Sequence, residues 1–226
     1  MTRSPPMPRK KRRRRRATTR TGRAARSLRA WARRAWRALR AAPRGIQAAV
    51  AVVSLVLLWA LANWVFQVVR KPAELFFPVS GALYKTPAET WQRYESIFRD
   101  HATATITPDF LAALAQIEGS GNPVARTYWR WYATWDLFEI YRPASSAVGM
   151  YQITNGTFVE AKRYCIHNHV VVADGPWHDW RSCWFNGLYA RVLPSHAAEM
   201  TSALLDRGVA DILTRRRIEN ASLQQR

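Results

Sequence analysis

The sequence predicts a mainly α-helical domain behind a single N-terminal transmembrane helix. One apolar stretch, residues 46–69, is long enough to cross a lipid bilayer. Two later segments begin with helix-capping signals, and no series of alternating apolar and polar residues indicates a hairpin or a sheet. These features divide the 226 residues into four parts: an arginine-rich arm (1–44), a transmembrane helix (45–70), a linker (71–85) and a helical domain (86–226).

The positive charge of the chain is confined to its N-terminal arm. The formal net charge is +20, which at first indicates nucleic-acid binding. Residues 1–44 hold 18 Lys or Arg and no acidic residue, whereas residues 72–226 hold 15 basic and 15 acidic residues. The folded part is therefore neutral, and we expect no nucleic-acid partner for it.

The apolar stretch 46–69 reads as a membrane anchor. As a helix it would span roughly 36 Å, enough to cross a bilayer with some tilt. Four polar residues interrupt it: Gln47, Ser54, Asn63 and Gln67. Three aromatic residues lie toward its end, where an aromatic belt belongs: Trp59, Trp64 and Phe66. By the positive-inside rule, the arm stays in the cytoplasm and the remainder is exported.

The N-terminal region also has features of a signal peptide and of a nucleic-acid-binding segment. Residues 60–62, Ala-Leu-Ala, resemble a signal-peptidase site, but the charged region before them is far longer than a signal peptide carries. The basic run 9–16 also suits nuclear import or DNA binding, which the following membrane span makes secondary. Residues 23–40 read as a basic amphipathic helix lying on anionic inner-leaflet lipid. For residues 1–22, a disordered arginine tail is equally consistent.

Four helices are expected after the linker. Thr86-Pro87-Ala88-Glu89 forms a capping box with proline at the first helical position, and its helix should run to about His101. Thr107-Pro108-Asp109 repeats the start signal and opens a helix that ends at Glu118. Two further helical segments follow, around residues 154–164 and 195–215.

Cys165 and Cys183 are the two cysteines of the chain. In an exported domain an even pair indicates a disulfide, whereas in the cytoplasm they would be two buried thiols. The predicted topology favours the disulfide, which would close a loop that carries several histidines.

We expect no metal and no other cofactor. Three histidines lie in the loop between the cysteines: His167, His169 and His178. They lack the HExxH or CxxC spacing that makes a zinc site specific. His196 and Glu199 share a helical face but have no third ligand nearby in sequence. Solvated or hydrogen-bonded histidines are therefore the better interpretation.

Glu118 closes an apolar, helix-patterned run and is followed at once by Gly119-Ser-Gly-Asn-Pro123. Four apolar residues recur at helical spacing and predict one buried stripe: Phe110, Leu111, Leu114 and Ile117. Glu118 lies at the edge of that stripe, so we expect it to face apolar neighbours and a loop. Desolvation raises the pKa of a carboxyl group, as a general acid near neutral pH requires. On this segment alone, a solvated glutamate at a helix end is the simpler interpretation.

A second segment, residues 145–154, contains further residues that could form a site together with Glu118. Gly149 permits close backbone approach, Met150 and Tyr151 offer an apolar and aromatic wall, and Gln152 supplies donor and acceptor groups. Together with the Glu118 segment, it resembles the lytic transglycosylase catalytic domain, a lysozyme-like family related to goose-type lysozyme. That family carries a catalytic Glu at a helix end, then a Gly-Asn-Pro-like turn, then a Gly-Leu-Met-Gln-like segment before another helix.

The resemblance covers about residues 105–190 and implies a lysozyme-like helical fold with Glu118 as the catalytic residue. It implies substrate-binding roles for residues of the turn, the second motif and a third: Ser120, Asn122, Gly149, Met150, Tyr151, Gln152, Asn186 and Tyr189. The implied substrate is the β-1,4 bond between N-acetylmuramic acid and N-acetylglucosamine in peptidoglycan glycan strands. Glu118 would protonate the glycosidic oxygen and then deprotonate the muramyl C6 hydroxyl, giving a 1,6-anhydro end. The implied location is the bacterial inner membrane, with the domain in the periplasm.

The chain departs from the family pattern at three places. Gly119 follows the catalytic Glu where the family has Ser, and Ser120 comes one place later. The aromatic-rich segment 127–141 is longer than the family's, and Trp184-Phe185-Asn186 only faintly echoes its Ala-Tyr-Asn motif. An inactive glycan-binding component of an envelope-spanning secretion or conjugation assembly is therefore an alternative to an active enzyme.

A hydrolytic muramidase of the same fold is the other alternative. Hydrolysis usually employs a second carboxylate, for which Asp136 and Glu139 are the candidates. Their simpler interpretation is loop charge paired with Arg130 or Arg142, and a transglycosylase is accordingly favoured. Of the aromatic residues in 127–141, most should pack at the edge of the core, with one or two touching glycan.

Overall fold

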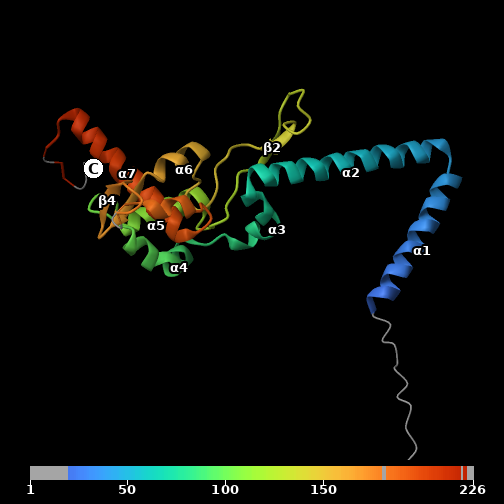
Figure 1. Ribbon diagram of the computed structural model, residues 1–226, viewed down its shortest axis with the longest axis horizontal. Coiled ribbons are helices and arrows are strands. Elements are labelled where there is room, and N and C mark those ends of the chain that lie inside the picture. Colours follow the sequence, from blue (N-terminus) through green and yellow to red (C-terminus); the bar gives the residue numbers. More distant parts are fainter. Residues whose placement is uncertain (1–19, 180–181, 220, 223–226) are drawn as a thin grey trace, which may run out of the picture. The chain divides into compact units, whose positions relative to one another are not determined.

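The computed structural model describes residues 20–179, 182–219 and 221–222 (Figure 1). Its described part is mainly helical, with seven α-helices, three 3₁₀ helices and two small antiparallel sheets. Two compact units are present, Met1–Trp59 and Ala60–Arg226, and helix α2 passes from one into the other. Each unit is considered by itself.

The first unit contains α1 (Arg20–Ala41) and the beginning of α2 (Arg44–Arg70). α1 confirms the predicted basic helix, whereas the run 9–16 lies outside the described residues. Among the described helices, α2 alone is long and apolar enough to cross a membrane. Its large aliphatic side chains from Ile46 to Leu61 are exposed, as they would be on a lipid-facing helix.

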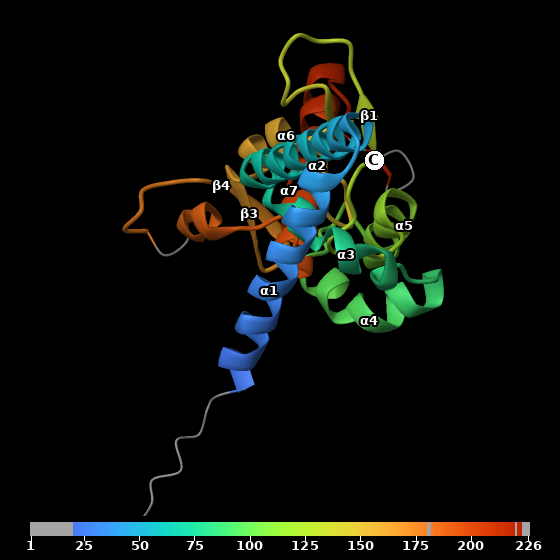
Figure 2. The ribbon, with the colours of Figure 1, turned by 90° about the vertical axis from the view of Figure 1, so that its right-hand side faces the viewer.

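The second unit has a core built from four helices, which Figure 2 shows gathered together. They are α4 (Pro87–Asp100), α5 (Pro108–Gly119), α6 (Asn155–Ala161) and α7 (Pro194–Arg216). Thr86 accepts from the backbone N–H of Glu89, whose side chain in turn accepts from the Thr86 N–H, so the predicted capping box is confirmed. Thr107 caps α5 in the same way through the Phe110 N–H. The core side chains include Phe98, Leu111, Met150, Ala198 and Met200.

Two short hairpins contradict the expectation that the domain lacks them. β1 (Trp129–Trp131) pairs with β2 (Tyr141–Pro143), and β3 (Tyr164–His167) pairs with β4 (Val170–Ala173). Strands of three or four residues are too short to produce a visible alternation of apolar and polar residues. The predicted helix 154–164 accordingly ends at Ala161, and its last residue begins β3 instead.

The predicted disulfide is present. Cys165, on β3, is joined to Cys183 in the loop before α7. The bridge ties the β3–β4 hairpin to that loop, which also contains the third motif.

Residues 71–85 are part of the fold rather than a linker. They form η1 (Pro72–Phe76), α3 (Phe77–Ser80) and η2 (Gly81–Leu83). The Glu74 carboxylate is completely buried, and it pairs with Lys71 Nζ at 3.1 Å and Arg126 Nη1 at 3.1 Å. It also accepts a hydrogen bond from Trp129 Nε1 at 2.8 Å. A buried carboxylate with these partners holds residues 71–85 against the domain. The proline and glycine residues of this segment had instead indicated a linker.

Replacing Glu74 by Gln should destabilise the fold strongly. The amide has no charge, so Lys71 and Arg126 would lose their counter-ion in a buried setting, at a cost of about 3 kcal/mol or more. The control is Glu95→Gln, which removes an exposed pair with Arg99 on α4 and should cost no more than about 0.5 kcal/mol. Unfolding of the full chain in detergent, followed by near-ultraviolet circular dichroism, measures both. Equal losses would contradict a structural role for the buried pair.

Candidate active site

Helix α5 places Glu118 at its exposed end. The core side of α5 is formed by Leu111, Ala115 and Gly119, each one turn apart. The predicted buried stripe is therefore only partly correct: Leu111 is buried, but Phe110 is exposed and Ile117 is 79% exposed. Ala115 and Gly119 share the buried side with Leu111, and the backbone of Met150 approaches Gly119 closely. The prediction favoured larger residues because it followed hydrophobicity alone.

The carboxylate of Glu118 is exposed to solvent, contrary to the expectation from sequence. Within the described part of the chain, it makes no hydrogen bond and no ion pair. Its neighbour Gly119 is the residue that points inward. Glu118 is thus an unpartnered acid at a helix end, with the apolar side chain of Ile117 beside it.

The end of α5 lies directly on the second motif. A Cβ atom on Gly119 would lie 2.7 Å from Cα and 2.8 Å from the carbonyl oxygen of Met150. Side chains do not approach backbone so closely, so this contact requires glycine at position 119. The contact brings the Glu118 segment and the Gly149–Gln152 segment together.

Hydrogen bonds hold the second motif in an unusual backbone conformation. Gly149 and Gln152 both have positive φ angles, 84° and 47°. The Gly149 N–H donates to the Ala125 carbonyl at 2.8 Å, and Gln152 Nε2 donates to the Gly149 carbonyl at 2.9 Å. Gln152 is half-buried, and its amide group serves the turn itself.

The turn after Glu118 is organised by Asn122. Its buried side chain donates to the Ser80 carbonyl at 2.7 Å and accepts from the Val124 N–H at 3.0 Å. Asn122 therefore shapes the turn and is unavailable to a ligand. Ser120, which caps α5 in the left-handed conformation (φ 48°), is half-buried and keeps an accessible side chain.

Met150 and Tyr151 lie behind the site rather than lining it. Met150 is completely buried in the core cluster. The Tyr151 hydroxyl is also buried, with no hydrogen-bond partner in the described structure, and burial raises its pKa. These two predicted substrate-binding residues serve to support the segment.

The third motif is likewise structural. Asn186 is buried and donates to the carbonyls of Tyr164, at 2.7 Å, and Lys162, at 3.1 Å. The hydroxyl of Tyr189 donates to Glu199 Oε2 at 2.6 Å, and its ring stacks on His196 with centroids 4.2 Å apart. Burial raises the pKa of Tyr189, with the Glu199 hydrogen bond acting in the same direction.

Glu199 and Arg191 support the site, although sequence reasoning assigned neither to it. The buried carboxylate of Glu199, on α7, also accepts from the Ile166 N–H at 2.9 Å. Arg191 donates to the carbonyls of Ser146, at 2.9 Å, and Ile153, at 2.8 Å, which tie its loop to the second motif. The sequence did offer one indication for Glu199: it is an acidic residue on the apolar side of the last predicted helix.

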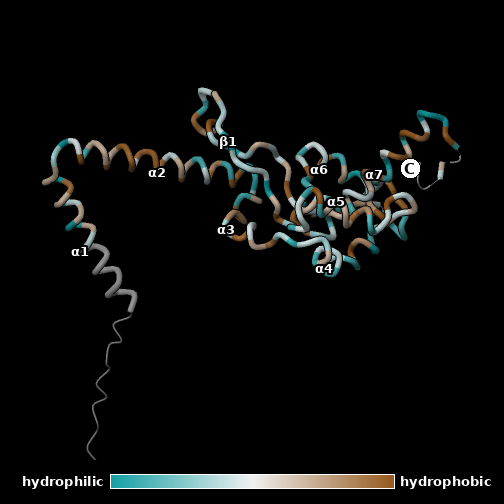
Figure 3. The backbone as a smooth tube through the Cα atoms, turned by 180° about the vertical axis from the view of Figure 1, so that it is seen from behind, coloured by the Kyte–Doolittle hydropathy of each residue, from teal (hydrophilic) through white to brown (hydrophobic). Residues whose placement is uncertain are grey.

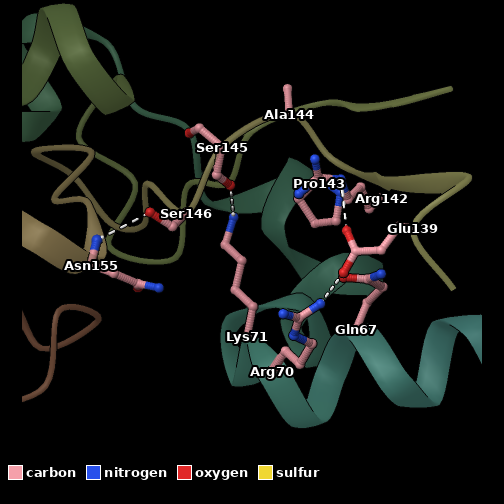
Figure 4. A pocket seen from close by; sticks show the side chains of 10 residues that line it. All are labelled: Gln67, Arg70, Lys71, Glu139, Arg142, Pro143, Ala144, Ser145, Ser146 and Asn155. Carbon is pink, nitrogen blue, oxygen red and sulfur yellow. Dashed lines mark hydrogen bonds and ion pairs between the residues drawn. The ribbon is translucent and has the colours of Figure 1, made fainter. Parts of the chain in front are cut away.

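The carboxylates between the two motifs lie on the β1–β2 hairpin. Glu139 pairs with Arg70 and with Arg142 Nε at 2.9 Å, so one of the predicted arginine partners is correct. It lines a polar cavity of about 210 Å³, shown in Figure 4, to which the Glu118 segment contributes no residue. Asp136 accepts from the Phe138 N–H at 3.0 Å within the loop.

The histidine loop shows no metal-binding arrangement in the part of the chain described. No group of three metal-ligating side chains comes together there. His167 and His178 are exposed, and His169 Nδ1 lies 2.9 Å from the Ala102 carbonyl oxygen.

No family model, no curated protein and no solved structure matches this chain. What the site can do therefore depends on its own residues: an exposed carboxylate at a helix end, packed through Gly119 onto a strained turn.

Replacing Gly119 by Ala should destabilise the domain by about 1–3 kcal/mol, because the new Cβ overlaps the backbone of Met150. The matched control is Gly156→Ala on α6, where nothing lies within 4 Å of the added atom. That change should leave the unfolding midpoint unchanged or raise stability by up to about 1 kcal/mol. Equal urea-unfolding midpoints for the two variants would rule out the contact between Gly119 and the Met150 backbone.

Proposed function

We propose that this chain is a membrane-anchored enzyme that cleaves the β-1,4 bond between N-acetylmuramic acid and N-acetylglucosamine in peptidoglycan, as a lytic transglycosylase. The observation that carries the proposal is the contact of Gly119 with Met150, which sets Glu118 beside the Gly149–Gln152 segment. Helix α2 is the proposed anchor in the bacterial inner membrane. The arginine-rich arm would lie on anionic cytoplasmic lipid and the second unit in the periplasm.

Glu118 is the proposed acid and base. Its protonated form donates to the glycosidic oxygen while positive charge develops at the muramyl C1 atom. The resulting carboxylate then accepts the proton of the muramyl C6 hydroxyl group while the oxygen of that hydroxyl attacks C1. This step forms a 1,6-anhydro end without water. The exposure of Glu118 leaves its carboxyl group accessible to a glycan strand lying over the end of α5.

The charges on the hairpin support transglycosylation over hydrolysis. A hydrolase needs a second carboxylate to activate water or to stabilise the cation. Glu139 is neutralised by two arginines, and it lines a cavity that the Glu118 segment does not enter. Asp136 is engaged in its own loop. Neither is placed as a second catalytic group, so the C6 hydroxyl of the substrate is the proposed nucleophile.

Gly119 is compatible with activity. The family's Ser at this place would put a Cβ atom into the Met150 backbone, so glycine is what this packing requires. Ser120, one residue later, offers a hydroxyl group beside Glu118.

Glu118→Gln should abolish cleavage of purified peptidoglycan by the full chain in detergent. An amide cannot donate the proton, and loss of a general acid lowers the rate by about a hundredfold or more. The readout is mass spectrometry of released muropeptides, where 1,6-anhydro ends from the unmodified chain are expected. The control is Glu160→Gln on α6, an exposed acid away from the two motifs, which should cleave normally.

Other products would decide between the alternatives. Reducing ends without the anhydro group would identify a hydrolytic muramidase. Binding of glycan without any cleavage by the unmodified chain would refute the enzyme and favour a glycan-binding component of an envelope assembly.

A further inference from the structure

Polar side chains on one face of α2 bind the β1–β2 hairpin. Asn63 and Gln67 are four residues apart on α2, so they share a face. Asn63 Nδ2 donates to the Tyr141 carbonyl at 2.7 Å, and Gln67 Nε2 donates to the Phe138 carbonyl at 2.6 Å. Lys71, the first residue after α2, donates through Nζ to the Ser145 carbonyl, just beyond β2, at 3.2 Å. The last turns of the apolar helix are thus attached to the hairpin.

The neighbouring face of α2 strengthens this attachment. The rings of Phe66 and Phe138 stack with centroids 4.9 Å apart, and Arg70 pairs with Glu139. Asn63 and Gln67 are only 2% and 5% exposed. The Nδ2 group of Asn63 and the Nε2 group of Gln67, which would be costly on an apolar helix in lipid, are therefore paired with the hairpin backbone. Asn63 Oδ1 is buried without a hydrogen-bond partner in the described part of the chain.

The length of α2 places the hairpin at the level of the membrane surface. The stretch 46–65 at the start of the apolar run spans roughly 30 Å at 1.5 Å per residue. The hydrocarbon core of a bilayer is about 30 Å thick, so a membrane-spanning α2 would leave it near Val65. The residues from there to Arg70 would then pass through the headgroup region. The hairpin is bound along this same stretch.

Large aromatic and apolar side chains are among the exposed residues of the hairpin. Trp135 is fully exposed, Trp131 is 66% exposed, and Leu137 between the strands is exposed as well. The hairpin stands out sideways from the end of α2 in Figure 1, and Figure 3 shows hydrophobic residues both along α2 and in the hairpin. Tryptophan is the residue enriched where membranes meet water.

Basic side chains lie at the base of the same hairpin. The cavity in Figure 4 is lined by Arg70, Lys71 and Arg142, with Glu139 as its single acidic residue. Arg70 and Arg142 are partly exposed, with Glu139 shared between them. Cations beside exposed tryptophans match the phosphate and acyl regions of a lipid surface.

We propose that the β1–β2 hairpin, residues 129–143, is a second membrane contact, lying in the outer headgroup region beside α2 with Trp131, Trp135 and Leu137 toward the lipid. This proposal depends on the anchoring of α2 that the proposed function includes. A lipid surface is favoured over glycan because the hairpin is bound along the stretch of α2 that emerges from the bilayer. The hairpin thereby holds the second unit at a defined orientation on the membrane.

Depth-dependent fluorescence quenching tests the contact. The full chain, with its Cys165–Cys183 disulfide intact, receives one added cysteine that carries an NBD fluorophore, and it is reconstituted into vesicles of phosphatidylcholine and phosphatidylglycerol. The probe positions are Trp135→Cys on the hairpin, Leu57→Cys within the span and Ile212→Cys on the exposed side of α7. Nitroxide-labelled lipids, with the label near the headgroup or deep in the acyl chain, serve as quenchers.

The probe at 135 should be quenched more by the shallow label than by the deep one, the probe at 57 more by the deep label, and the probe at 212 by neither. Quenching at 57 with a probe at 135 that behaves like that at 212 would overturn the hairpin contact and leave the anchor intact. Absence of quenching at both 57 and 135 would overturn the anchor as well. A probe at 135 that ignores lipid but responds to added peptidoglycan fragments would assign the hairpin to glycan. Cleavage activity of the labelled proteins is assayed separately, so loss of activity is distinguished from loss of membrane contact.

Discussion

The ion pairs of the buried Glu74 carboxylate with Lys71 and Arg126 are the interaction on which the structure of the second unit depends. Through Lys71 it holds the end of α2, and through Arg126 and Trp129 it holds the chain that leads into the hairpin. Arg126 also forms a β-bridge with Val148, next to the second motif. Burial lowers the pKa of Lys71, and the charge of Glu74 opposes part of this shift. One buried acid therefore joins the end of α2, the hairpin and the candidate site.

This connection changes what the anchor does. A flexible tether would let the domain move freely above the membrane, but α2 enters the fold without an intervening loop, and Asn63 and Gln67 are buried within it. The last part of α2, from Ala60 on, belongs to the second unit and is attached to it through these two residues. For the enzyme proposed above, such attachment would limit how far Glu118 can move from the membrane.

Local signals in the sequence predicted the helices well and the site only partly. Thr86 and Thr107 cap α4 and α5 as expected, because capping depends on neighbouring residues alone. The exposure of Glu118 and the buried role of Asn122 could not be foreseen, since both depend on which side of α5 packs against Met150 and on the distant Ser80. The burial of Glu74 was hidden for the same reason: its partners lie more than fifty residues away, except for Lys71.

The long segment between the two motifs also finds a physical explanation. Thr127 Oγ1 donates to the Ser145 carbonyl at 3.2 Å, and the Ala144 N–H donates to the Tyr128 carbonyl at 2.9 Å, so the segment leaves and returns at one place. A segment that leaves and returns at one place does not separate the parts of the chain on either side of it. The turn after Glu118 and the Gly149–Gln152 segment can therefore meet despite the length of the segment between them. The hydrogen bonds of this segment to Asn63 and Gln67 on α2 are the basis of the membrane contact proposed for it.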